Sequence, residues 1–165
     1  NNVNLADRGA LGSRAFSTPY EPGSTVKALT AASLIDAGVA NQRPQVVSPY
    51  ALELANGGGI ISDSFYHEDQ RLTLAGALVE SSNTAIAQYT DLLDAASRHD
   101  YLAKFGLGQA TGIGFNGESS GTLYDAADWD ARTNYAVPFG QGLSTTSIQM
   151  ASAYQALKGR NEEKI

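Results

Sequence analysis

The sequence predicts one mainly helical globular domain that spans residues 1–165. Three observations lead to this prediction. Apolar residues recur at helical spacing in four stretches of the chain. The 165 residues suit a single domain, and no internal repeat, low-complexity tract or linker divides them. The composition, with 42% hydrophobic and 17% charged residues, is typical of a globular chain with a buried core.

The first helix is expected over residues 24–37. Pro22 and Gly23 indicate a turn, and Ser24 follows where an N-cap or first-turn residue belongs. Apolar residues then continue at helical spacing until Gly38 ends the run. The stretch before the turn has no clean period: residues 1–10 are expected to be irregular or extended, and residues 14–16 a short approach to the turn.

Short strands and turns are expected in the next part of the chain. Residues 41–49 are predicted to be a loop or a short strand, since they combine two prolines with Val46 and Val47. Three consecutive glycines at 57–59 predict a hairpin or surface turn within residues 52–61. The polar residues 62–70 are expected to be irregular.

Further helices are expected over residues 73–80 and 84–97, separated by Ser81-Ser82-Asn83. Asp100 is expected to cap a short helix that ends at Gly106. Residues 109–129 are glycine-rich and predict a long loop. The last helix is expected to begin at Ser144 or Thr145, because apolar side chains follow at three-residue steps.

Charge and composition exclude several classes of function. The net charge of −6 and the pI of about 4.7 argue against nucleic acid or anionic lipid as a partner. The absence of cysteine excludes disulfides and thiolate zinc sites, and fits an exported bacterial protein. No apolar stretch approaches the roughly 18 residues that span a bilayer. Because the sequence starts at Asn1 rather than Met, we expect an excised or processed chain.

Ser24 and Lys27 are the first candidate catalytic pair. On a helix, residues three apart lie on one face, one turn apart. The alternative is that Ser24 is only a helix cap, but a capping box carries Glu or Gln at the position of Lys27. A partly buried lysine near a helix N-terminus loses its proton readily and can then serve as a base for a serine hydroxyl.

The segment Ser81-Ser82-Asn83 allows the same two interpretations. Its members are ordinary cap residues between two helices. In the functional interpretation, Ser81 relays a proton and Asn83 orients the substrate or the lysine.

The remaining candidate motifs indicate no cofactor or metal. The Gly-x-Gly-x-x-Gly pattern at 112–117 follows a short helix rather than a strand, which excludes a dinucleotide site. Gly140-Gln-Gly142 lacks the Lys-Ser/Thr of a phosphate-binding loop. His67 and His99 lack a second ligand at metal spacing and are predicted to be solvated. The aspartates around Trp129 lack the spacing of a calcium loop.

Four segments, in the same order as in a known family, resemble penicillin-binding protein transpeptidases. Tyr-Glu-Pro-Gly-Ser-Thr-Val-Lys at 20–27 is similar to the active-site signature, and Leu-Val-Glu-Ser-Ser-Asn-Thr-Ala-Ile-Ala-Gln at 78–88 to the Ser-x-Asn segment. Residues 105–121 and 139–154 resemble the following loop and the last core helix. Within this family, the four segments are most similar to those of the monofunctional class B enzymes of septum formation or elongation.

The resemblance implies a fold, and it shows that one motif of the family is missing from the sequence. The chain is expected to be a mainly α fragment of an α/β domain, the helical part of the penicillin-binding transpeptidase or β-lactamase-like fold, with most of the antiparallel sheet outside residues 1–165. The family's Lys-Thr/Ser-Gly motif is absent, and Lys158-Gly159-Arg160 does not match it. The domain is therefore expected to be partial, and the 165 residues alone to be inactive and poorly soluble.

The resemblance also implies a reaction and its residues. Ser24 is the expected nucleophile, Lys27 its base, Ser81 the proton relay, and Asn83 the residue that holds substrate and lysine. Ser82, Gly140 and Gly142 are expected to contact substrate. Peptidoglycan stem peptides and β-lactams are the implied ligands, with no metal, cofactor or nucleic acid. The parent is expected to be anchored at the extracytoplasmic face of the bacterial membrane, beside divisome or elongation proteins.

Two other functions stay open at this point. A serine β-lactamase or β-lactam sensor shares the Ser-x-x-Lys pair, but hydrolyses or retains the acyl group. A non-catalytic helical module that scaffolds cell-wall partners is compatible with the missing third motif. Slow release of a bound penicillin favours the transpeptidase over the β-lactamase.

Overall fold

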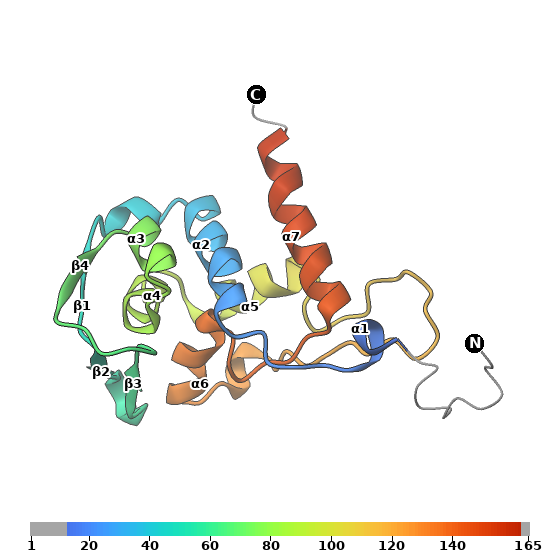
Figure 1. Cartoon of the computed structure of the whole chain (residues 1–165), viewed down its shortest axis with the longest axis horizontal. Coiled ribbons are helices and arrows are strands. Elements are labelled where there is room, and N and C mark those ends of the chain that lie inside the picture. Colours follow the sequence, from blue (N-terminus) through green and yellow to red (C-terminus); the bar gives the residue numbers. More distant parts are fainter. Residues whose placement is uncertain (1–12, 163–165) are drawn as a thin grey trace.

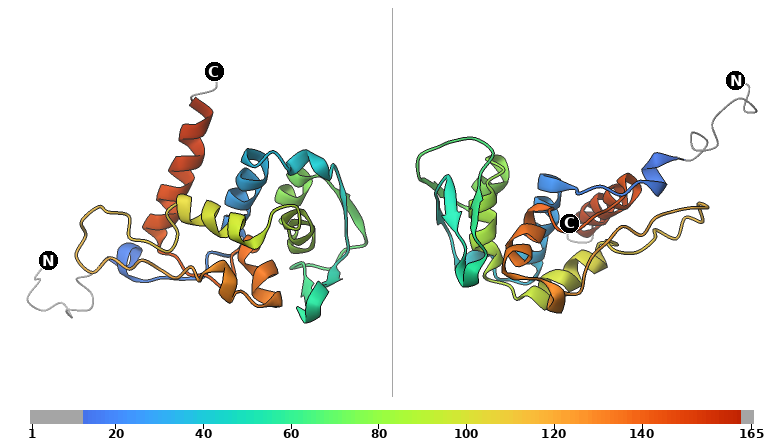
Figure 2. Two further views of the ribbon diagram at one scale, coloured as in Figure 1. Left: turned by 180° about the vertical axis from the view of Figure 1, so that it is seen from behind. Right: turned by 90° about the horizontal axis from the view of Figure 1, so that it is seen from below.

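The computed structural model describes residues 13–162 of the chain, which contain helices and two small antiparallel sheets (Figure 1). Helix α2 lies in the middle, with α4 and the strands toward one end and α7 toward the other; Figure 2 shows the same order from two other sides. The prediction of a mainly helical chain is confirmed for this part. The expectation for residues 1–10 lies outside the described residues.

The Ser24 turn, defined here as residues 22–26, leads directly into α2. Its residues Gly23–Val26 form a 3-10 turn, and the α-helix follows over Lys27–Asp36. The predicted helix from residue 24 to 37 is therefore present, with a tighter first turn. Tight 3-10 turns commonly begin an α-helix. Before it, Arg14–Ser17 forms the one-turn helix α1, which the sequence did not predict.

Helices α3 and α4 flank Ser81. Helix α3 spans Leu74–Val79, and the Thr73 hydroxyl accepts a hydrogen bond from Gly76 N at 3.0 Å as its N-cap. Helix α4 spans Asn83–Thr90. Thus both helices lie close to their predicted positions at their N-terminal ends.

The expectation of one helix over residues 84–97 is wrong. Helix α4 ends at Thr90, and α5 spans Ala95–Lys104. The Asp94 carboxylate accepts a hydrogen bond from Ser97 N at 2.8 Å and so caps α5. Asp100, the predicted cap, lies inside α5. The apolar residues of the turn continue the helical spacing across this break. The pattern of apolar residues therefore did not reveal where α4 ends.

The four strands form two pairs. Strand β1 (Val46–Ser48) pairs antiparallel with β4 (Gln70–Leu72), and β2 (Ala51–Glu53) with β3 (Ile60–Ser62). The 3-10 turn Ala55–Gly57 lies between β2 and β3. The hairpin and the short strand predicted here are confirmed, whereas β4 begins where an irregular segment was expected. A further 3-10 turn, Ala40–Gln42, precedes β1.

The C-terminal half contains a long loop, as predicted, and three short elements that were not. These are the 3-10 turns Ala126–Asp128 and Val137–Phe139 and helix α6, Ala131–Ala136. The last helix, α7, spans Ser147–Glu162 and begins later than predicted. Ser144 forms a bridge with Thr122, and Thr145 with Tyr20, so neither residue is free to enter the helix.

Two apolar clusters hold α2 from opposite sides. Leu29 belongs to a buried cluster shared with α5 and α7, and Leu34 to a cluster shared with α3, α4 and β1. A third cluster lies between the β2–β3 hairpin, α4 and α6. Because α2 is fixed on both sides, the Ser24 turn at its N-terminus has a rigid base.

Among residues 13–162, no helix is long and apolar enough to cross a membrane.

Gln149 ties the start of α7 to the long loop, and its loss should destabilise the fold. Its side chain is 1% exposed, accepts from Thr146 N at 2.7 Å, and donates to Gln109 O and Ser120 O at 2.7 Å each. Gln149→Ala leaves these buried groups unpaired, so we expect the free energy of unfolding in urea to fall by about 2–4 kcal/mol. Gln155→Ala, on the exposed face of α7, is the control; equal losses would contradict this role.

Candidate active site

The C-terminal part of the chain holds the Ser24 turn through backbone contacts. Gly23 N donates to Gly140 O at 2.9 Å, Tyr20 pairs with Thr145, and the Tyr154 hydroxyl donates to Thr25 O at 2.8 Å. Ser24 itself is exposed, and within residues 13–162 its hydroxyl makes no hydrogen bond. The helix-cap interpretation of Ser24 is therefore not supported, and its Oγ is free to react.

Gly140 and Gly142 pack against the same turn. A Cβ atom on Gly140 would lie 2.0 Å from Gly23 O, so only glycine fits there. Gly142 N donates to the Glu21 carboxylate at 3.0 Å. Both glycines thus have a positioning role beside Ser24, whereas their expected contact with substrate stays a prediction.

Lys27 is buried at the first turn of α2, one turn after Ser24. It is only 2% exposed, and its Nζ donates to Ser81 O and, at 3.2 Å, to Ser81 Oγ. Burial lowers the pKa of Lys27 to about 8, although attraction by the Asp63 charge opposes the shift. A lysine with this pKa is partly neutral near pH 8 and can accept a proton.

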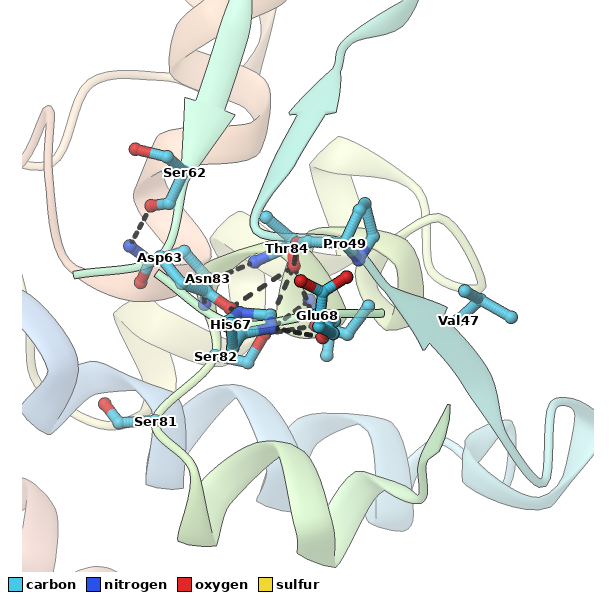
Figure 3. Close-up of polar contacts among 12 residues, drawn as sticks. Val47, Pro49, Ser62, Asp63, His67, Glu68, Ser81, Ser82, Asn83 and Thr84 are labelled. Carbon is cyan, nitrogen blue, oxygen red and sulfur yellow. Dashed lines mark hydrogen bonds and ion pairs between the residues drawn. The ribbon is translucent and has the colours of Figure 1, made fainter. Parts of the chain in front are cut away.

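Ser81 lies between α3 and α4 (Figure 3), and its carbonyl and hydroxyl oxygens accept hydrogen bonds from Lys27. Its φ angle of 52° is the only positive one among the described residues other than glycine. This left-handed conformation is costly for a serine, by roughly 1 kcal/mol or more. Lys27 and Ser81 are 54 residues apart in sequence, and the fold brings them into contact, as a proton relay between them would require. The catalytic roles of the two residues stay predictions.

Ser82 and Asn83 both make hydrogen bonds within the protein. Ser82 is 2% exposed, and its Oγ caps α4 by accepting from Ala85 N at 2.9 Å. Asn83 Nδ2 donates to Ser62 O at 2.9 Å. In the described residues the Asn83 amide is turned toward β3, and Ser81 rather than Asn83 binds Lys27. The expected role of Asn83 in holding substrate and lysine stays a prediction.

The Asp63–His67 pair is the part of the site that the sequence analysis missed. Asp63 is 8% exposed and accepts from the backbone N–H groups of Asn83 and Thr84. His67 Nε2 lies 3.0 Å from Asp63 Oδ2 (Figure 3), and the hydrogen bonds to the Glu68 carbonyl and to Asp63 raise the pKa of His67. His67 is partly exposed, as a surface residue was expected to be, but the sequence analysis did not predict its bond to Asp63. A single carboxylate and a single histidine in a polar stretch carry no sequence signal for such a pair.

A hollow of about 380 Å³ opens beside Ser81. Residues from the loop between β3 and β4, together with Glu80 and Ser81, line it. Ser81 thus shares this hollow with Asp63 and His67, whereas Ser24 and Lys27 do not line it.

In the part of the chain that the structure describes, no group of three or more histidine or carboxylate side chains could hold a metal ion. Asp130 instead caps α6 by accepting from Thr133 N, and His99 lies near Trp129. What the site offers chemically is an exposed hydroxyl, a buried lysine that can be neutral, and a second hydroxyl bound to that lysine.

Comparison with known proteins agrees with this arrangement. The model of the penicillin binding protein transpeptidase domain matches residues 1–162. Penicillin-binding protein PbpB of Mycobacterium tuberculosis is 35% identical over 147 residues, which are 89% of this chain and 21% of the relative. Peptidoglycan D,D-transpeptidase FtsI of Escherichia coli is 31% identical over 158 residues, 95% of this chain and 26% of the relative.

Solved structures give the same result. Penicillin-binding protein 3 of Mycobacterium tuberculosis, in complex with ampicillin, has a TM-score of 0.83 at 35% identity and covers 92% of this chain, which matches 34% of that protein. The transpeptidase domain of penicillin-binding protein 3 from Burkholderia pseudomallei has a TM-score of 0.78 at 26% identity, with 89% of this chain and 44% of that one covered. The expected fold, the mainly helical part of a transpeptidase domain, is confirmed.

The chain spans about a fifth to a quarter of the length of these curated relatives. The family match nevertheless includes every one of the residues placed at the site above. The chain belongs to the penicillin-binding protein transpeptidase family, and within it to class B.

Proposed function

We propose that this chain carries the acylation centre of a peptidoglycan D,D-transpeptidase, with Ser24 as nucleophile. The observation that carries the proposal is Lys27: it is buried one helical turn from an exposed Ser24 hydroxyl and donates to Ser81. The names of PbpB and FtsI and the ampicillin complex of the related penicillin-binding protein 3 support the same reaction class.

In the acylation step, Ser24 Oγ attacks the carbonyl carbon of the penultimate D-Ala of a stem peptide, and Lys27 Nζ takes the hydroxyl proton. The Ser24 backbone N–H, near the start of a helical turn, is a donor for the oxyanion. The proton then passes through Ser81 Oγ to the leaving amine, and the terminal D-Ala departs. An ester joins Ser24 to the rest of the donor peptide.

A second amine then attacks the ester, takes the acyl group and restores Ser24. Asn83 lies beside Ser81 and is proposed to orient the peptide amide, for which its Ser62 contact must open. A β-lactam enters the same route when Ser24 opens its ring amide. Because peptidoglycan lies outside the cytoplasmic membrane, the proposed place of action is extracytoplasmic, with divisome or elongation proteins as partners of the parent.

Peptide mapping tests the assignment of Ser24. A polypeptide that carries this sequence in its complete transpeptidase domain is treated with a penicillin and digested with trypsin. We expect the peptide from Ala15 to Lys27 to gain the mass of the penicillin, with the fragment ions placing it on Ser24. In the Ser24→Ala control this peptide should stay unmodified.

Persistent labelling of Ser24→Ala, or label on another peptide, would show that the nucleophile is elsewhere. The release rate separates the transpeptidase from a β-lactamase. A long-lived acyl-enzyme is expected here, whereas rapid return of free enzyme would indicate a hydrolase.

A further inference from the structure

The Asp63 carboxylate lies at the N-terminal end of α4, directly after β3. Its Oδ1 accepts from Asn83 N and, at 3.1 Å, from Thr84 N. These N–H groups belong to the first turn of the helix and have no partner within it. A carboxylate in this place also complements the positive end of the helix dipole. Asp63 thereby fixes the residues that directly follow Ser81 and Ser82.

The other carboxylate oxygen of Asp63 faces His67. His67 Nε2 lies 3.0 Å from Asp63 Oδ2, and His67 Nδ1 lies 2.8 Å from Glu68 O. Both partners can only accept a hydrogen bond, so the imidazole makes both bonds at once only when both ring nitrogens carry a proton. The geometry therefore favours a protonated His67 paired with an ionised Asp63.

The same carboxylate acts on the base of the proposed reaction. Asp63 is the charge that opposes the effect of burial on the pKa of Lys27. Besides Lys27, the charged groups near Asp63 are His67, which binds it, and Asp69. Glu80 lines the hollow that Asp63, His67 and Ser81 share.

We propose that Asp63 is a positioning residue of the acylation centre. Its carboxylate holds the Ser81–Asn83 segment through the start of α4, and it places its negative charge, paired with His67, in the hollow that Ser81 lines. This inference rests on the proposed function. Asp63 does not touch the reacting atoms; it acts through the backbone at Asn83 and through the charge that Lys27 senses.

Two substitutions separate these two effects. Asp63→Asn can retain the hydrogen bonds, because its carbonyl oxygen still accepts from the start of α4 and its amide can donate to a neutral His67 Nε2. It removes the negative charge of residue 63, and His67 must then be neutral to accept from the new amide. Asp63→Ala removes the charge and leaves the N–H groups of Asn83 and Thr84 without their acceptor. Asp128→Asn, on an exposed loop, is the matched control.

The experiment measures the acylation rate constant with a fluorescent penicillin between pH 5.5 and 9.5, in the complete transpeptidase domain. The rate should rise with pH as Lys27 loses its proton. In Asp63→Asn the midpoint of this rise should move to lower pH, by about 0.5–1 unit, because an opposite charge near the ammonium is lost. In Asp63→Ala the plateau at high pH should also fall at least tenfold. Asp128→Asn should match the parent.

An unmoved midpoint, or one at higher pH, in Asp63→Asn would overturn the charge role. An unchanged plateau in Asp63→Ala would overturn the positioning role. A second readout does not need acylation: the pKa of Lys27, followed by NMR of labelled lysine side chains, should also fall in Asp63→Asn. A parent that never reacts with penicillin would refute the proposed function, while the NMR titration would still decide whether Asp63 controls Lys27.

Discussion

Lys27→Arg is expected to lower the rate of acylation by penicillin at pH 8 by about 10²–10⁴-fold, the range for the loss of a general base. Arginine keeps the positive charge, but with a pKa above about 12 it cannot accept the proton of Ser24. Lys27 is buried and binds two oxygens of Ser81, so the larger guanidinium also risks poor packing. Lys27→Met, which has a similar length and no charge, should show a similar loss.

The pH dependence of the acylation rate in the parent protein tests whether neutral Lys27 is the reactive form. The pKa of Lys27 is about 8, so the neutral form is about one tenth of the population at pH 7 and predominates above pH 9. Acylation should thus rise through pH 8 in the parent, and this rise should be absent in both variants. Lys104→Arg, at an exposed position, is the control. Near-normal acylation by a folded Lys27→Arg or Lys27→Met variant would mean that Lys27 has only a structural role.

Gly140→Ala should reduce acylation by at least 10²-fold and destabilise the domain. A methyl group there would lie 2.0 Å from Gly23 O and 2.5 Å from Gly23 N, so the Ser24 turn must move. The movement also breaks the bond from Gly23 N to Gly140 O. A displacement of about 1 Å is enough for a hundredfold loss of rate.

Gly112→Ala is a matched control for the backbone strain. Gly112 has a φ angle of +76°, close to the +87° of Gly140, but no atom lies within 4 Å of its added Cβ. Both variants therefore carry the penalty of alanine at positive φ, and only Gly140→Ala carries the clash. Urea unfolding and penicillin acylation measured on both would separate the effects. Equal losses in the two variants would show that the contact between Gly140 and Gly23 does not position Ser24.

Local patterns in the sequence predicted the parts of the site that local interactions form. The turn before α2 follows from Pro22 and Gly23, and the hairpin from the glycines at 57–59. The boundary at Asp94 was missed because a cap and an apolar spacing compete there, and the cap prevails by pairing with Ser97 N. Helix propensity alone therefore does not predict where one helix ends and the next begins.

Contacts between distant segments could not be predicted from the residues alone. The resemblance to a known family suggested that Ser81 and Lys27 meet, but nothing in either segment indicates the hydrogen bond across 54 residues. The role of Asp63 depends on where β3 ends relative to α4, which only the folded chain defines. His67 is held by Asp63 four residues earlier, in a loop without regular spacing.

Ser81 is a point of local frustration, where the backbone and the side chain favour different residues. Its φ angle of 52° suits glycine, and because Ser81 is exposed, glycine would cost little packing. A design procedure that scored stability alone would therefore place glycine here and remove roughly 1 kcal/mol of strain. The resulting protein would fold well, but Lys27 would keep only the carbonyl oxygen of residue 81 and lose the hydroxyl. Where a natural sequence keeps a residue that its backbone conformation disfavours, a functional requirement is a common reason. Under the proposed mechanism that requirement is the hydroxyl of Ser81.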